Sequence, residues 1–191
     1  MSTLLSRLNE NTYQKFAYDN EYELVASKFV PDANWSVESM DIKINEDTGS
    51  PTGDVICHIY TDNAGVPGTS LGSGTISNPN PGGTFTVYTA TFGSPISLTS
   101  GVTYWYVLTS NVQSASAYYS ARLNAGSAGS GANNNGSTWT NNTNVLYCVL
   151  YGTVVTVNIA KLKTANSLAF AKIKTRNSLA VAKIKTINSL V

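Results

Sequence analysis

The residues best suited to chemistry in this chain are amides and one carboxylate, in predicted loops that also hold a tryptophan. They are Asp62, Asn63, Asn135, Trp139 and Asn141. Amide and carboxylate groups can hold sugar hydroxyls, and an aromatic ring can stack on a sugar ring. The pattern predicts a weak carbohydrate-binding site. The alternative is a set of polar loop residues beside a tryptophan packed on the edge of the fold.

Catalytic and metal-binding patterns are weak. His58 is the only histidine and lies between Cys57 and Ile59 in an apolar run, so we expect a packed residue. Cys57 and Cys148 both lie in apolar runs, which favours buried free thiols over a disulfide, a zinc site or a nucleophile. All acidic residues fall at or before Asp62 and offer no clear carboxylate pair for hydrolysis. One carboxylate is few for calcium. We expect no enzyme, cofactor or metal.

The composition is polar but poorly charged. Charged residues make up only 12% of the chain, and eleven tyrosines with a net charge of +1 argue against disorder. The charge is unevenly distributed along the chain. All acidic residues lie in its first third, whereas residues 160–191 carry seven basic residues and no acidic one. The two ends are either solvated faces, or an acidic end and a basic end that complement each other between subunits, or the basic end meets an anionic surface.

Alternating apolar and polar residues, or short continuous apolar runs as at 55–60 and 145–151, predict strands at 23–30, 35–44, 55–60, 84–92, 102–109, 117–121 and 145–151. A change of phase near Ser39 and Met40 predicts a bulge in the second of these. Turn signals recur about every ten residues, which is typical of an antiparallel β-sandwich. Residues 1–20 are predicted to be a short helix or irregular arm, and residues 124–137 a long loop.

The middle of the chain contains DVICHIYTD, GVPGTSLGSGTIS, FTVYTATFGSPISLTSGVTYWYVLTSN and STWTNNTNVLYCVLYG, in that order. These segments resemble the β-sandwich module of bacterial surface proteins and phage structural proteins, of the choice-of-anchor or carbohydrate-binding-like kind. The resemblance covers residues 21–152. It implies a jelly-roll-like fold with a binding or structural role, and it implies no reaction.

Residues 160–191 repeat with a period of eleven, as AKLKTANSLAF, AKIKTRNSLAV and AKIKTINSLV. In a β structure, each Asn-Ser pair would be a tight turn. In a helical structure, the period would specify a right-handed supercoil. Thr, Asn and Ser in every repeat favour the β structure. The repeats also resemble the Lys-Thr-x-Asn-Gly-Leu repeats of phage virion proteins, with Ser in place of Gly.

One repeat cannot bury its apolar side chains alone, so we expect other copies of the chain to cover them. The residues expected to make this homo-oligomer, with a trimeric fibre as the economical form, are Leu162, Leu168, Phe170, Ile173, Leu179, Val181, Ile184, Ile187 and Leu190. The lysines alternate with no aromatic residue besides Phe170, so nucleic acid is not an expected partner.

The sequence thus predicts an N-terminal arm at 1–20, a β-sandwich domain at 21–156 and an oligomerising segment at 157–191. No apolar stretch has the length of a signal peptide or a membrane span, so we expect synthesis in the cytoplasm and no membrane insertion. The expected function is a structural virion protein of a phage, such as a decoration, head-fibre or tail-associated protein that contacts other virion proteins. The alternative is a carbohydrate-binding module for a host-surface glycan, at the cell surface or outside the cell.

Overall fold

The computed structural model describes residues 1–18, 22–125 and 130–156, and all its regular elements in these ranges are β-strands, which confirms the all-β class. None of the described residues belongs to a helix that could cross a membrane. The strands are β1 (Ser2–Arg7), β2 (Thr12–Phe16), β3 (Leu24–Phe29), β4 (Trp35–Thr48), β5 (Val55–Asn63), β6 (Val66–Ile76), β7 (Thr86–Leu98), β8 (Tyr104–Ser110), β9 (Tyr118–Ala125), β10 (Gly131–Asn134), β11 (Trp139–Asn142), β12 (Asn144–Leu146) and β13 (Cys148–Val154).

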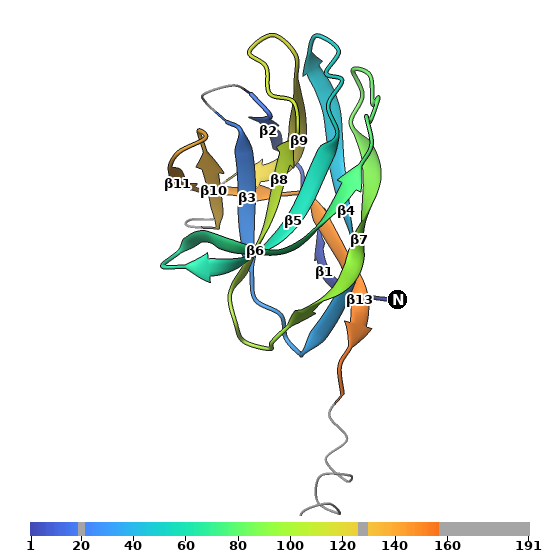
Figure 1. Ribbon diagram of the computed structural model, residues 1–191, viewed down its shortest axis with the longest axis vertical. Coiled ribbons are helices and arrows are strands. Elements are labelled where there is room, and N and C mark those ends of the chain that lie inside the picture. Colours follow the sequence, from blue (N-terminus) through green and yellow to red (C-terminus); the bar gives the residue numbers. More distant parts are fainter. Residues whose placement is uncertain (19–21, 126–129, 157–191) are drawn as a thin grey trace, which may run out of the picture. The chain divides into compact units, whose positions relative to one another are not determined.

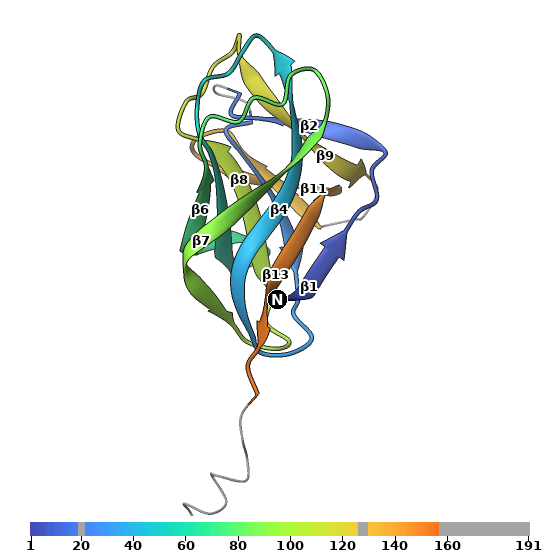
Figure 2. The ribbon, with the colours of Figure 1, turned by 90° about the vertical axis from the view of Figure 1, so that its right-hand side faces the viewer.

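The strands form one curled antiparallel sheet. Its order is β1-β13-β4-β7-β6-β5-β8-β3-β10-β11, and β9 lies off this path, where it pairs with β2, β4 and β12. In Figure 1, the hairpin of β10 and β11 and the tip of the β5–β6 hairpin project to the same side. Figure 2 shows β13 beside β1 and β4. β13, which overlaps the strand predicted at 145–151, is therefore an interior strand of the sheet.

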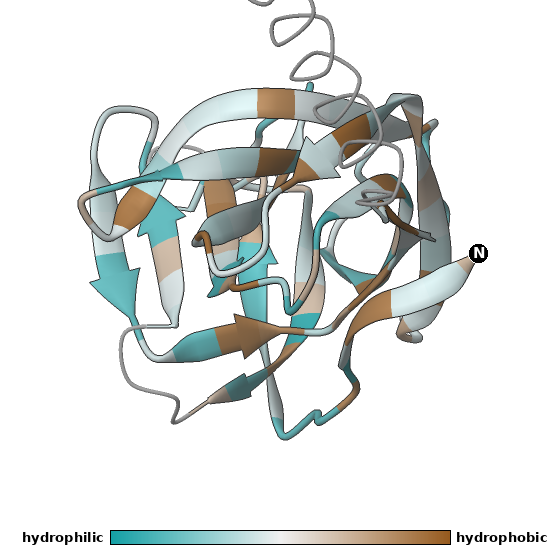
Figure 3. Ribbon diagram, turned by 90° about the horizontal axis from the view of Figure 1, so that it is seen from below, coloured by the Kyte–Doolittle hydropathy of each residue, from teal (hydrophilic) through white to brown (hydrophobic). Residues whose placement is uncertain are grey.

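Successive side chains of a strand point to opposite faces of the sheet. The side chains on the inner face of the curled sheet form the hydrophobic core. Along β4, Val37, Met40, Ile42 and Ile44 are fully buried, whereas Asp41 and Lys43 are partly exposed. Seen from below in Figure 3, hydrophobic and hydrophilic residues alternate along several strands. This alternation is the physical basis on which the strands could be predicted.

The bulge predicted in β4 is confirmed. The pairing of β4 with β7 shifts between Val37 and Ser39, and its pairing with β13 shifts at the same two residues. The extra residue brings both Ser39 and Met40 into buried positions. It therefore preserves a continuous buried face across the change of phase.

Cys57 on β5 and Cys148 on β13 are free and buried, as predicted. Burial raises the pKa of both thiols well above its ordinary value, since the thiolate is poorly solvated there. Both residues belong to the main hydrophobic core. They act as small apolar side chains rather than as nucleophiles.

The prediction of a helix or irregular arm at the N-terminus is wrong. β1 pairs with β13 and β2 pairs with β9, and Phe16 is fully buried. A register shift between Thr3 and Leu5 lets the neighbouring Leu4 and Leu5 both pack against the core. Two adjacent apolar residues in a bulged strand imitate helical spacing, which explains the error.

The predicted loop at 124–137 is also only partly correct, because it contains β10. The backbone of this short strand pairs with β3 on one side and with β11 on the other. Its Gly, Ala and Asn residues have low strand propensity, so the pairing is imposed by neighbouring strands. The predicted strand at 145–151 is divided into β12 and β13 at Tyr147.

Residues Met1–Val155 form one compact unit. The repeats and all nine residues expected to make the homo-oligomer belong to 157–191, which lies outside the described residues.

Candidate functional site

Strand β8 is buried on both of its faces. Tyr106 and Leu108 belong to the main core, whereas Trp105 and Val107 point away from it into a second cluster. All four side chains are fully buried. Apolar residues on both faces explain why the sequence of β8 is a continuous hydrophobic run.

The second cluster, called here the outer cluster, is built from β3, β5, β8, β10 and β11. Its buried members are Ala26, Trp105, Val107 and Ala132, and Leu24, Tyr60 and Trp139 pack against them. Ala26 is paired with both Val107 and Ala132 across the sheet, so two methyl groups stand beside each other on neighbouring strands. Small residues at these positions leave space for the large rings of the cluster.

Asp62 fixes the Trp105 ring from the end of β5. The Trp105 Nε1 group donates a hydrogen bond of 2.7 Å to Oδ1 of Asp62. The other carboxylate oxygen, Oδ2, accepts a bond of 3.1 Å from the backbone N–H of Gly65. Gly65 has a φ of 89°, which suits glycine in the β5–β6 turn. Asp62 thus satisfies a buried indole and shapes the turn while it remains exposed.

On the same strand as Asp62, the aromatic rings of His58 and Tyr60 contact each other. Their rings meet edge to face with centroids 5.5 Å apart, and Nδ1 of His58 lies 3.2 Å from Oγ of Ser70 on β6. Desolvation lowers the pKa of His58 and raises the pKa of Tyr60. Both rings are therefore neutral at pH 7 and offer stacking surface with hydrogen-bonding edges.

The structure brings three of the five predicted ligand residues to this face. Asp62 bonds to Trp105, Trp139 packs on the outer cluster, and Asn141 lies two residues after Trp139 on β11, opposite Ala132. Because side chains two apart share a face of a strand, Asn141 and Trp139 point the same way. Trp139 and Asn141 lie in a strand rather than in the predicted loop.

The other two predicted residues lie at the tips of two hairpins. Oδ1 of Asn135 accepts bonds from the backbone N–H groups of Ser137 and Thr138, so Asn135 shapes the β10–β11 turn. Asn63 is exposed at the end of β5. The sequence alone did not indicate Tyr60 and Trp105 as site residues. Tyr60 follows Ile59 and Trp105 precedes Tyr106, so each lies on the strand face opposite to a residue of the main core. This alternation was the signal in the sequence that could have indicated them.

The arrangement suits recognition. Half-buried Tyr60 and Trp139 can stack on a flat ring, and Asp62, His58 and Asn141 can bond to hydroxyl groups at its edge. The described residues contain no group of three His, Cys, Asp or Glu side chains placed to hold a metal ion.

Comparisons with known proteins found no family model that matches the chain and no curated protein that matches its sequence. Its function must therefore be argued from its own residues.

Proposed function

We propose that this chain is a non-enzymatic structural protein of a phage-like virion. Its β domain would be displayed outward, and its repeat segment would join copies of the chain, with a homotrimer as the expected form. The proposed location is a decoration, head-fibre or tail-associated position, in contact with other virion proteins.

The observation that carries this proposal is that the β domain closes before the repeats begin. β13 is an interior strand between β1 and β4, and the last residue of the main core in the described part is Leu150. The compact unit ends at Val155. The three repeats that follow this unit in the sequence carry apolar side chains that one repeat cannot bury alone, and assembly between copies of the chain would cover them.

The charge distribution supports assembly between copies. Residues 1–159 hold all eleven acidic side chains and five of the twelve basic ones, whereas residues 160–191 hold the other seven basic ones. An acidic domain and a basic segment attract each other, and the attraction acts between copies as well as within one.

We also propose that the curled sheet has the jelly-roll-like connectivity implied by the resemblance to choice-of-anchor modules. Strands from both halves of the sheet order share one core, since Val37 on β4 and Phe29 on β3 belong to the same cluster. Two facing layers of strands would produce such a shared core. An experimental structure would test the connectivity.

Native mass spectrometry of the full chain tests the assembly. We expect an oligomer for the full chain, and a monomer for the double variant Ile173→Asp and Ile184→Asp. The matched control, Asn177→Asp with Asn188→Asp, adds the same charges at the proposed turns and should remain an oligomer. A monomeric full chain, or an oligomer that survives the Ile variant, would contradict the proposal.

A second candidate function is recognition of a host-surface glycan by the outer cluster. Half-buried Trp139 and Tyr60 both pack on the outer cluster, and its buried Trp105 bonds to the Asp62 carboxylate. These features favour this function, because aromatic rings with polar neighbours are suited to sugars.

A glycan array with the full chain tests this second function. We expect Trp139→Ala to abolish binding and Tyr13→Ala to preserve it, since Tyr13 is a 50% exposed aromatic residue on β2, outside the outer cluster. An array without signal, or equal loss with both variants, would count against glycan recognition by this face.

A further inference from the structure

A pocket of about 500 Å³ lies at the end of β1, beside β9 and β12. Its lining includes Arg7, Asn9, Asn124 and Ser130, and Val145 provides an apolar wall. None of the residues that line it in the described part of the chain is acidic. The volume is within the range of small-molecule sites in proteins. None of its residues belongs to the outer cluster.

Arg7 is the charged group of this pocket. Its backbone is fixed by the pairing of β1 with β13, where Arg7 lies opposite Cys148. Its Nη2 group donates a hydrogen bond of 2.9 Å to the backbone carbonyl of Lys28. This carbonyl and the neutral phenol of Tyr106, which also faces Arg7, orient the guanidinium but do not neutralise it. The other N–H groups of its planar fork can bind an anion.

The nearby carboxylate is occupied elsewhere. Glu10 pairs with Nζ of Lys43 at 2.6 Å and lies 3.5 Å from Nε of Arg122. These are the ion pairs found among the described residues, and Arg7 is in neither of them. No carboxylate of the described residues pairs with Arg7, so its charge can serve a ligand.

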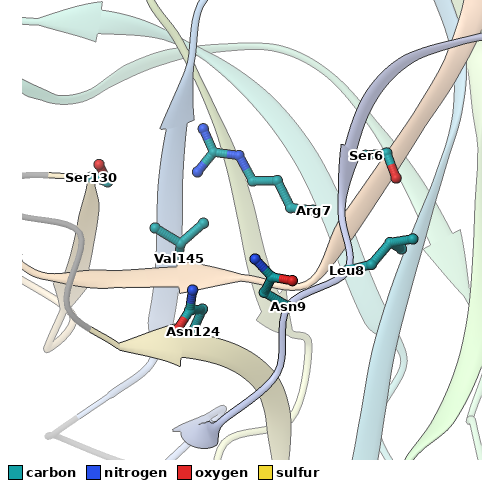
Figure 4. A pocket seen from close by; sticks show the side chains of 7 residues that line it. All are labelled: Ser6, Arg7, Leu8, Asn9, Asn124, Ser130 and Val145. Atoms are coloured by element: carbon teal, nitrogen blue, oxygen red, sulfur yellow. The ribbon is translucent and has the colours of Figure 1, made fainter.

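Neutral hydrogen-bonding groups complete the lining. Figure 4 shows the amides of Asn9 and Asn124 turned toward the side of the pocket on which Arg7 lies. Ser6 and Ser130 are also among the lining residues, although Figure 4 shows the Ser6 side chain on the side of β1 opposite to Arg7. Amide groups both donate and accept hydrogen bonds, so they suit a ligand with several hydroxyl groups.

We propose that this pocket binds a hydroxylated anion of monosaccharide size, with the guanidinium of Arg7 on its carboxylate or phosphate group. The inference does not depend on the virion role or on the outer cluster. An acidic sugar and a sugar phosphate share this chemistry, and the experiment distinguishes them.

Isothermal titration calorimetry of the full chain with glucuronate, glucose 6-phosphate and glucose tests the proposal. We expect at least one of the two anions to bind and glucose to bind at least about tenfold more weakly, because it lacks the charge-assisted bond. Whichever anion binds more tightly identifies the charged group. No heat with either anion, or equal affinity for glucose, would overturn the proposal.

Variants of the full chain locate the binding. Arg7→Gln should weaken the affinity about tenfold or more, and Asn9→Ala should weaken it about threefold without disturbing the sheet, since Asn9 is exposed between β1 and β2. Lys15→Gln removes a positive charge outside the pocket, and Trp139→Ala alters the outer cluster. Neither should change the affinity. Unchanged binding in both pocket variants would show that the pocket is not the site.

Discussion

The two faces of β8 differ in how they are buried. Tyr106 and Leu108 point into a core built from strands throughout the sheet, whereas the neighbouring Trp105 and Val107 point into the small outer cluster. Both sets are fully buried. The inner face is covered by many large side chains, and the outer face by two alanines and the partly buried Leu24, Tyr60 and Trp139.

Equally buried aromatic residues on the two faces differ in their hydrogen-bond partners. The hydroxyl of buried Tyr106 donates a bond of 2.8 Å to the carbonyl of Leu146, a contact within the domain interior. The indole of Trp105 instead bonds to Asp62, a carboxylate that is itself exposed. The outer face thus joins a buried aromatic ring to polar groups that a ligand can reach, which the inner face does not.

The largest expected difference between the faces comes from a pair of adjacent truncations on β8. Leu108→Ala should lower the free energy of unfolding by about 2–5 kcal/mol, because it leaves a cavity in the main core. Val107→Ala removes fewer atoms from a smaller cluster and should cost about 1–2 kcal/mol. Urea unfolding of both variants measures the difference. Equal costs would mean that the outer cluster is as much a part of the core as the interior.

A smaller effect is expected from the bond between Trp105 and Asp62. A double-mutant cycle of Trp105→Phe and Asp62→Ala should give a coupling free energy of about 1 kcal/mol, since one partner is exposed. Thermal unfolding of the four proteins provides the values. The matched change on the inner face is Tyr106→Phe, which removes the donor to the Leu146 carbonyl. This single change should lower the free energy of unfolding by at least about the same amount as the coupling. Additive effects of the first two changes would show that the contact contributes no stability.

The sequence was sufficient for the strands that alternate cleanly and insufficient where neighbours decide the structure. β4 and its bulge could be predicted, because Trp35, Val37, Met40, Ile42 and Ile44 record the buried face directly. β10 could not, since its small polar residues pair through their backbone with strands distant in the sequence. Such pairing leaves no pattern in the side chains.

The sequence also predicted only part of the candidate site. Asp62 and Trp139 were predicted as ligand residues, and the structure adds their common neighbour Trp105. Trp105 lies in the apolar run of β8, which gave no reason to separate it from Tyr106. Only the pairing of β8 with β3 and β5 shows which side of the sheet each ring occupies.

The smallest expected effect concerns the pH dependence that the outer face contributes. Burial lowers the pKa of His58 in the folded chain, so the unfolded chain binds its proton more readily. The stability that His58 provides as a neutral ring is therefore complete above its unfolded pKa of about 6.5, and it is lost as the pH falls through that value toward the folded pKa. His58 is the only histidine, so His58→Gln should flatten the dependence of the unfolding midpoint on pH between about 5 and 7. Urea midpoints across this interval provide the measurement. The same slope in both proteins would mean that the ring is as well solvated in the folded chain as in the unfolded one, and that the face beside Tyr60 is open to water.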